Sequence, residues 1–313
     1  MDLTTSPAAP AFDPDPRIGV VLITWNRREE AVVAVARLLD LPEQPAVVVV
    51  DNGSQDGTVA ALERTFAGHV GLSIVALPCN AGATARNVGV RHLSTPYVAF
   101  CDDDTWWEPG SLRHAADVLA AHPRLAVLTA RIVVEPGGHD DPIIPELRDS
   151  PVLGAHWLPG PALASFLAGA SAVRREAFLA VGGFSERLWL GGEEELLAAD
   201  LAAAGWELCY LPQMVVHHRA SLQRDPHHRR QVGLRNTLWF TWLRRPVRTG
   251  LRRTLFLART VPRDRISAAA FLDALRGLPW VLRERRVLPA HAEMRFVAVE
   301  AAQTGSGARR YTS

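Results

Sequence analysis

The sequence predicts an α/β protein in which helices cover both faces of a mostly parallel sheet. Three observations lead to this fold class. Runs of β-branched and aliphatic residues alternate with segments of helical periodicity, short loops join them, and the strand runs are apolar along their whole length. Strands that are apolar along their whole length are typical of parallel sheets, because helices bury both faces of such sheets.

The predicted elements follow one another in a regular order between residues 18 and 101. The strands are continuous apolar runs, and the helices are segments in which apolar residues recur every three or four positions. The predicted strands are Ile18–Thr24, Ala46–Val50, Leu72–Leu77 and Tyr97–Cys101. The predicted helices are Arg28–Leu39, Thr58–Phe66 and Thr84–Leu93.

The composition is that of a globular protein with a substantial core. Of 313 residues, 48% are hydrophobic and 21% are charged, and the formal net charge is +1. The three cysteines are far apart and lack metal-type spacing, which fits a reducing cytoplasm. Because no apolar run reaches about 18 residues, a membrane-spanning helix is not expected. Residues 1–16 lack the features of a secretory signal and are expected to be a disordered leader.

Polar residues gather where the predicted strands end. Thr24 and Asn26 follow the first strand, Asp51 ends the second, and three carboxylates at 102–104 follow the fourth. In open α/β sheets, ligands bind outside this carboxyl edge. Clustered carboxylates repel one another unless a cation lies between them, and a divalent ion bound to phosphates is a common partner. A single Asp at a turn or helix cap is common and needs no function to explain it. Several polar groups on the same edge of the sheet favour a binding site instead.

The start of the third predicted helix offers groups that could meet an anion. Asn80, Gly82 and Arg86 place amide donors, a small residue and a guanidinium there. The glycine pattern of a dinucleotide-binding first turn is absent after the first strand, and a Walker phosphate loop is absent too.

Four ordered motifs resemble those of the family 2 inverting glycosyltransferases. They are TWNR at 24–27, VVDNGSQDGT at 49–58, NAGATARNVG at 80–89 and DDD at 102–104. Their order makes the resemblance specific, whereas an Asp-Gly-Ser loop alone would be weak. The resemblance implies the GT-A fold, in which a nucleotide-binding half is joined to an acceptor-binding half.

The resemblance also implies a domain organisation. Residues 17–221 would form the GT-A domain, with 17–135 as the nucleotide-sugar half and 136–221 as the acceptor half. A basic helical region would follow over 222–302, and a disordered tail over 303–313.

The activity implied by the resemblance is metal-assisted transfer of a hexosyl or deoxyhexosyl group in a single inverting displacement. The donor would be a nucleoside-diphosphate sugar, and the acceptor a hydroxyl of a glycan, a lipid-linked saccharide or a natural product. Asp104 and Asp102 would hold Mn²⁺ or Mg²⁺. The expected nucleotide-sugar contacts are Thr24, Asn26, Asp51, Asn80, Gly82, Arg86, Asp102 and Asp103.

The segment LGGEEEL at 190–196 resembles the acidic motif of the family, usually Glu-Asp at a helix start. A general base must come within about 2.6–3.2 Å of the acceptor hydroxyl. The second acidic position is Glu194 rather than Asp, so an added methylene changes its reach. Glu194 is the expected base, with Glu193 as support or alternative. A helix start enriched in acids to suit the helix dipole is the other explanation.

His217 and His218 end a later predicted strand, at a position where many relatives have a histidine that contacts the metal or the diphosphate. Neighbouring side chains on a strand point to opposite faces, so only one of the two can face the site. His217 is the one expected to join the metal ligands, and an ordinary loop histidine is the alternative.

The chain becomes strongly basic toward its end. Between Arg219 and Arg286 there are 17 arginines and four carboxylates, and no lysine occurs in the chain. Pro246 and Pro262 are expected to divide this region into several helices. Basic helices with Trp, Phe and Leu are candidates for peripheral contact with the inner face of a membrane, and a helical cap or a dimer surface is the alternative. No nucleic-acid recognition motif is present, so no nucleic-acid partner is expected.

Two other classes of function stay open at this point. A sugar nucleotidyltransferase would also use paired acids and a metal, although its glycine-rich phosphate loop is not evident after the first strand. A non-catalytic nucleotide-sugar or membrane-binding module on the same fold is the other. A glycosidase also uses two carboxylates but needs no nucleotide-like edge.

Overall fold

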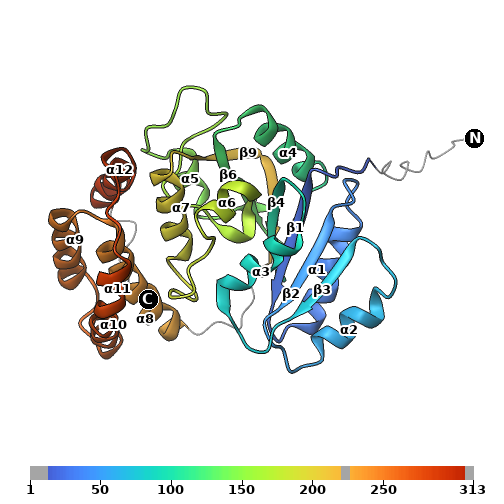
Figure 1. Ribbon diagram of the computed structural model, residues 1–313, viewed down its shortest axis with the longest axis horizontal. Coiled ribbons are helices and arrows are strands. Elements are labelled where there is room, and N and C mark those ends of the chain that lie inside the picture. Colours follow the sequence, from blue (N-terminus) through green and yellow to red (C-terminus); the bar gives the residue numbers. More distant parts are fainter. Residues whose placement is uncertain (1–12, 220–225, 307–313) are drawn as a thin grey trace, which may run out of the picture.

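A computed structural model describes residues 13–219 and 226–306 (Figure 1). The first half alternates as predicted, and the ends of its main elements lie within one residue of the expected positions. Its elements are β1 (Ile18–Thr24), α1 (Arg28–Leu39), β2 (Ala46–Asp51), α2 (Thr58–Thr65), β3 (Leu72–Ala76), the short 3₁₀ turn η1 (Gly82–Thr84), α3 (Ala85–His92) and β4 (Tyr97–Asp102).

The four strands of this half form a parallel sheet in the order β3-β2-β1-β4. Thr24 of β1 pairs with Asp51 of β2, and Ile23 pairs with Asp102 of β4, so the three strands end at one edge. Successive residues of β1 such as Val20 and Val21 are fully buried. Both faces of the sheet are therefore covered, as their apolar runs predict.

The sheet continues into the second half as β8, β6, β9 and β5, which makes one nine-stranded sheet with β7 paired to β6. This part is mixed, because β8 is antiparallel to both β4 and β6 whereas β9 is parallel to β6. Its strands are β5 (Thr105–Trp107), β6 (Leu125–Val134), β7 (His139–Asp140), β8 (Ser171–Arg174) and β9 (Glu207–His218). Its helical elements are α4 (Ser111–Ala121), α5 (Ile144–Arg148), η2 (Ala168–Ala170), α6 (Arg175–Ala180) and α7 (Glu193–Ala203).

Five helices complete the described chain, with breaks at Pro246 and Pro262 as expected from the missing proline N–H. They are α8 (Pro226–Arg244), α9 (Val247–Thr260), α10 (Arg265–Arg276), α11 (Leu278–Glu284) and α12 (Ala290–Ser306). A second hydrophobic core joins them to α7 through side chains such as Leu196, Leu238 and Phe240. Figure 1 shows this helical layer beside α7, at the end of the molecule away from β3.

The predicted leader and tail fall largely outside the described residues. Residues 1–12 and 307–313 are not described, and α12 extends to Ser306, past the expected start of the tail at 303. Within residues 13–219 and 226–306, no helix combines the length and the apolar character needed to cross a membrane.

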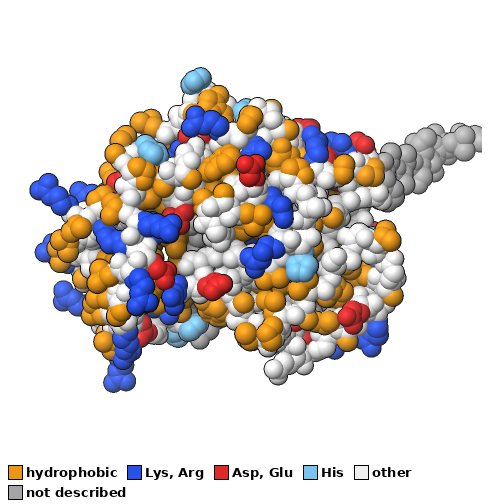
Figure 2. All heavy atoms as spheres, in the orientation of Figure 1, with side chains coloured by type: hydrophobic (Ala, Val, Ile, Leu, Met, Phe, Trp, Pro, Cys, Tyr) orange, Lys and Arg blue, Asp and Glu red, His pale blue; other side chains and the backbone are white. Residues whose placement is uncertain are grey.

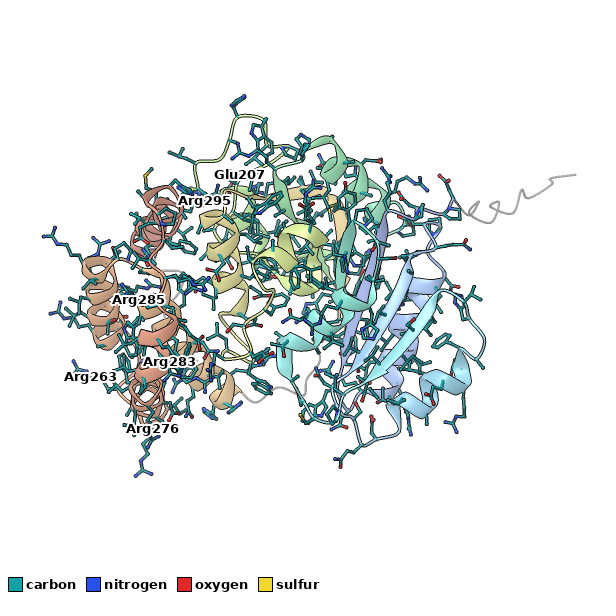
Figure 3. All side chains as sticks on the ribbon, viewed as in Figure 1. Glu207, Arg263, Arg276, Arg283, Arg285 and Arg295 are labelled. Carbon is teal, nitrogen blue, oxygen red and sulfur yellow. The ribbon has the colours of Figure 1, made fainter. Side chains whose placement is uncertain are left out.

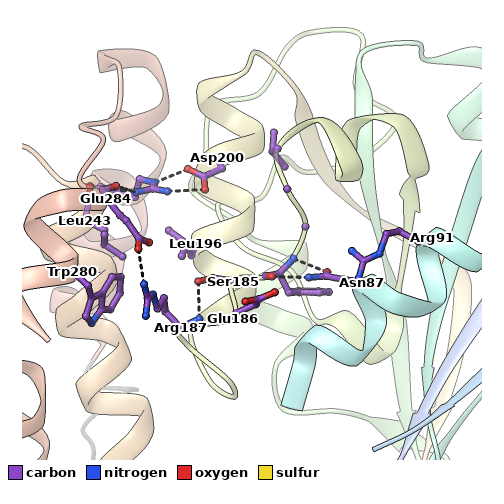
Figure 4. Close-up of a pocket in the computed structure, with 15 residues that line it drawn as sticks. Asn87, Arg91, Ser185, Glu186, Arg187, Leu196, Asp200, Leu243, Trp280 and Glu284 are labelled. Atoms are coloured by element: carbon purple, nitrogen blue, oxygen red, sulfur yellow. Dashed lines mark hydrogen bonds and ion pairs between the residues drawn. The ribbon is translucent and has the colours of Figure 1, made fainter. Parts of the chain in front are cut away.

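A cavity of about 670 Å³ lies where α3, the 181–187 loop and α7 meet the C-terminal helices (Figure 4). Charged side chains on its wall pair with each other. Arg187 Nη2 lies 3.0 Å from Glu284 Oε1, and Arg244 Nε lies 2.6 Å from Asp200 Oδ1. None of the predicted site residues lines this cavity. It belongs to the junction between the two hydrophobic cores and not to the sheet edge.

Candidate active site

Two arginines surround the three carboxylates that follow β4. Arg27 Nη1 lies 2.9 Å from Asp103 Oδ1 and 3.4 Å from Asp104 Oδ2. Arg86 forms an ion pair with Asp102. The repulsion among the carboxylates is thus offset by guanidinium groups of the chain itself. Arg27 was not among the predicted site residues, although its position in the first motif places it at the same edge.

Thr24 and Asp103, both expected to contact the nucleotide sugar, form a hydrogen bond with each other. Thr24 Oγ1 donates to Asp103 Oδ2 at 2.8 Å. Burial raises the pKa of Asp103 to about 7, against the lowering influence of the Arg27 charge and the Thr24 hydrogen bond. Thr24 therefore orients a carboxylate at this edge.

The structure places His218, not His217, beside the carboxylates. His218 Nε2 lies 3.8 Å from Asp104 Oδ2. His217 Nδ1 lies 3.0 Å from Glu135 Oε1, and its ring stacks on Trp106 with 5.3 Å between ring centroids. The expectation that His217 faces the site is therefore wrong. The reason is strand β5, which pairs Trp106 opposite His217 so that strand alternation turns His218 toward Asp104.

Asp104 and His218 fit a divalent cation that also binds phosphate oxygens. Because metal–ligand distances are about 2.1 Å, atoms 3.8 Å apart can contact one cation. No group of three or more His, Cys, Asp or Glu residues in the described ranges could hold a metal by itself. Further ligands would have to come from substrate phosphates and water, which is common for Mg²⁺. Asp102, the other expected ligand, is paired with Arg86.

Asp51 presents a buried carboxylate oxygen toward the same edge. The side chain ends β2 with 1% of its residue exposed, and its Oδ2 accepts a hydrogen bond from Ser54 N–H at 2.8 Å. No protein partner for its Oδ1 exists among the residues that the structure describes. Buried acceptors are normally satisfied, so a donor on a bound ligand would complete this group.

Asn26, Asn80 and Gly82 shape loops at the edge. Asn26 has a φ of 50°, and its N–H donates to Ser54 Oγ at 2.7 Å. Asn80 Oδ1 accepts from Gly82 N–H at 2.9 Å. Asn52, a buried residue that was not among the predicted contacts, donates through Nδ2 to Gly82 O at 3.3 Å. Asn26, Asn80 and Gly82 thus hold the backbone of these loops in place through contacts within the protein.

Gly82 also touches the loop that leads into the acidic motif. Ala83 N–H donates to Trp189 O at 2.8 Å, and a Cβ on Gly82 would collide with that oxygen. Trp189 has a φ of 58°, which is strained for an aromatic residue. The contact with the 80–83 turn therefore helps to hold the 188–192 loop in an unfavourable conformation.

Glu193 and Glu194 begin α7, and the η2 turn connects them to the sheet edge. Ala168 N–H donates to Glu194 Oε1 at 2.6 Å, and the adjacent Gly169 packs directly against the Asp102 carboxylate. Glu193 is 4% exposed, and its Oε2 has no hydrogen-bond partner in the described parts of the chain. Burial and the nearby charge of Glu193 raise the pKa of Glu194 to about 8. A carboxylate with a pKa this high is suited to accept a proton near neutral pH.

Asn236 of α8 holds the loop that precedes these glutamates. The residue is fully buried, and its Nδ2 lies 2.7, 3.0 and 2.6 Å from the carbonyl oxygens of Leu188, Leu190 and Gly191. The C-terminal region therefore supplies part of the framework of the site. Sequence reasoning missed Asn236, because the surrounding segment LRNTLWFTWL at 234–243 holds other polar residues and nothing in it distinguishes Asn236.

Replacing Asn236 with Ala is expected to lower both stability and turnover. Leaving buried carbonyl oxygens without a donor costs about 1–3 kcal/mol of unfolding free energy. The loosened loop should lower kcat while nucleotide affinity changes little. Trp239→Phe is the control, because it removes one buried hydrogen bond from the same helix, to Ala274 O at 3.0 Å, away from the loop. Equal losses of kcat in both variants would contradict a positioning role for Asn236.

Residues 19–181 match the model of the glycosyl transferase family 2. The N-acetylglucosaminyl-diphospho-decaprenol L-rhamnosyltransferase of Mycobacterium tuberculosis (strain H37Rv) is 29% identical over 284 residues, which cover 76% of this chain and 90% of that protein. The pre-mycofactocin glycosyltransferase of the same organism is 30% identical over 238 residues, covering 72% of this chain and 48% of that protein.

Two solved glycosyltransferase structures share the fold. A mannosyltransferase from Pyrobaculum calidifontis, in complex with GDP-Man and Mn²⁺, matches with a TM-score of 0.57 and 21% identity over 96% of this chain and 79% of that chain. GalNAc-T7 with UDP, GalNAc and Mn²⁺ matches with a TM-score of 0.61 and 14% identity over 85% of this chain and 56% of that chain. The GT-A fold predicted from the motifs is thus confirmed. Because the family match covers more than half of the residues, this chain belongs to glycosyl transferase family 2.

Proposed function

We propose that this glycosyltransferase moves a sugar from a nucleoside-diphosphate sugar to an acceptor hydroxyl with inversion at the anomeric carbon. The observation that carries the proposal is the link through η2. One short turn contacts both Asp102 at the sheet edge and Glu194 at the start of α7. A donor site and a general base would then face the same space.

The nucleotide-sugar donor is proposed to bind along the carboxyl edge. Asp51 Oδ1 lacks a partner in the described chain and would accept a base N–H. Asp104 and His218 would hold Mn²⁺ or Mg²⁺, which would neutralise charge on the leaving diphosphate. Arg86 is buried and paired with Asp102, so its proposed role is to fix that carboxylate. Asp102 would then orient the ribose or a metal-bound water, and Asp103 would contact the sugar.

Glu194 is proposed to act as the general base. Its carboxylate takes the proton of the acceptor hydroxyl as the oxygen forms a bond to the anomeric carbon. The bond between that carbon and the diphosphate oxygen breaks in the same step, and the electron pair leaves with the diphosphate. Attack from the face opposite the nucleotide inverts the configuration. Glu193 would support Glu194 by keeping its pKa high.

The acceptor is proposed to be a lipid-linked saccharide of the cell envelope, elongated at the cytoplasmic face of the membrane. The named rhamnosyltransferase acts on a polyprenyl-diphosphate sugar, and the alignment covers 90% of that protein. The donor would accordingly carry a hexosyl or deoxyhexosyl group.

Thermal unfolding with UDP, dTDP, GDP, ATP and NAD, each with and without Mn²⁺, tests the donor site. One nucleoside diphosphate is expected to raise the Tm by several degrees, and only when the metal is present. Ligand at a hundredfold excess over Kd adds about 2.7 kcal/mol to the free energy of unfolding, which accounts for a shift of this size. ATP and NAD serve as controls for non-specific anion binding. A shift with none of the three nucleoside diphosphates would overturn the proposal.

A further inference from the structure

The C-terminal helices expose most of the large apolar side chains at the protein surface. Among the residues that the structure describes, 14 large hydrophobic residues are exposed, and ten of them lie between 247 and 297. They include Leu272 and Leu275 of α10 and Leu282 of α11. Apolar side chains gathered in this way mark an interaction surface more often than scattered single residues do.

Helix α9 shows how this surface is arranged. Val247, Leu251 and Leu255 recur at every fourth position and are 65%, 62% and 55% exposed. Arg248 and Arg252 follow two of them directly and are exposed as well. With 3.6 residues per turn, the apolar residues form one stripe and the arginines form a second stripe beside it. A water-exposed helix would normally carry polar residues across this whole face.

The C-terminal helices carry an excess of positive charge. Eleven arginines and five carboxylates lie between residues 247 and 302. Each of the five carboxylates pairs with an arginine of the chain. Arg248, Arg252, Arg259, Arg265 and Arg283 are exposed and have no carboxylate partner within the described ranges. The positive charge is therefore available to an external partner.

The apolar residues and arginines occupy one end of the molecule. Figure 1 places α9, α10, α11 and α12 together at the end away from the N-terminal half. Figure 2 shows arginines projecting around apolar atoms over this end, and Figure 3 shows Arg263 and Arg276 extending outward from it. We call this surface, formed by the exposed apolar residues and arginines of 247–297, the basic apolar face.

We infer that the basic apolar face docks on an anionic membrane surface. A bilayer with anionic headgroups offers phosphates to the arginines and an apolar boundary to the leucine side chains, while long arginine side chains keep their charge in the headgroup layer. A second copy docked through the same face in a two-fold dimer would bring unpaired arginines close to their own counterparts. The inference explains how a chain acting on a lipid-linked acceptor could reach it, but it does not depend on the proposed reaction.

Sedimentation of the full-length protein with vesicles tests the inference without any donor or acceptor. Binding is expected with vesicles that contain phosphatidylglycerol, and on the order of tenfold less with phosphatidylcholine alone. It should weaken as salt is added, since salt screens the arginines. Absence of binding to the phosphatidylglycerol vesicles would overturn the inference and would leave the proposed sugar transfer untouched.

Two double variants and one control locate the contact. Leu251→Asp with Leu255→Asp, and separately Arg248→Ala with Arg252→Ala, should each weaken binding on the order of tenfold or more. Val33→Asp on α1, where Val33 is 52% exposed, should bind as the unchanged protein does. An unchanged Tm in all variants shows that their folds are intact. Undiminished vesicle binding by both double variants would contradict membrane docking through this face. So would a protein that forms dimers in solution when the dimers are lost only in the leucine double variant.

Discussion

The Glu194→Gln variant is expected to bind a nucleoside diphosphate as the unchanged protein does and to lose sugar transfer by about 10²- to 10⁴-fold. Glutamine keeps the size of the side chain and an oxygen that can accept the Ala168 N–H. It cannot take a proton from an acceptor hydroxyl. Because Asp51 ends β2 and Asp104 lies in the turn between β4 and β5, neither residue belongs to α7, and donor affinity should stay the same. Donor affinity and single-turnover transfer rates, measured on the same preparation, check both halves of this expectation.

Neighbouring glutamates provide the controls for this variant. Glu195→Gln removes one negative charge from the same helical turn and should retain most of the activity. Glu193→Gln should lower the rate moderately, because the pKa of Glu194 depends in part on the Glu193 charge. If Glu193→Gln abolishes transfer and Glu194→Gln does not, the base is the first acidic residue of the motif and our assignment is wrong.

The pH dependence follows from the raised pKa of the same residue. A general base works in its deprotonated form, so kcat/KM should rise with pH and level off above about 8, the pKa of Glu194. The residual activity of Glu194→Gln should lack this rise. Asp103, whose pKa is raised by burial to about 7, is expected to add its own rise through donor binding. Measuring nucleotide affinity against pH in the Glu194→Gln variant separates the two.

The first half of the fold could be predicted because its signals are local. Apolar runs such as Ile18–Thr24 and helical periodicity over Arg28–Leu39 lie within single elements, and their alternation dictates a parallel sheet. Strand β5 was not predicted, because three residues are too few to show a period. Pairing with β5 determines which histidine faces Asp104. Because β5 was not predicted, His217 was assigned to the site in place of His218.

The contacts that build the site are long-range, and sequence patterns do not show them. The carboxylate cluster was predicted to need a cation, and a divalent metal ion was the expected one. The structure adds Arg27 and Arg86, which come from separate motifs and meet the carboxylates only after folding. Asn236 acts on backbone carbonyls more than 40 residues earlier in the chain. Residue type and motif order thus predicted which edge of the sheet carries the site. Which side chains pair with one another at that edge depends on tertiary packing.

The Asp104→Asn variant is expected to lose the metal-dependent part of nucleoside-diphosphate binding. Partners that only orient metal ligands already change metal affinity by about 10- to 100-fold, so loss of a ligand carboxylate should cost at least as much. The fold should tolerate the change, because Arg27 keeps its closer ion pair with Asp103. Titration of Mn²⁺ at saturating nucleotide, followed by thermal unfolding, measures the effect directly.

The two histidines give a matched pair for the same experiment. His218→Ala should weaken Mn²⁺-dependent binding, since His218 Nε2 lies 3.8 Å from Asp104 Oδ2. His217→Ala should leave it unchanged, since that ring bonds to Glu135 and stacks on Trp106. Unaltered metal dependence in both Asp104→Asn and His218→Ala would show that the site holds no metal through these residues. Arg27 and Arg86 would then offset the charge of the carboxylates, and a donor diphosphate would have to be neutralised by some other group.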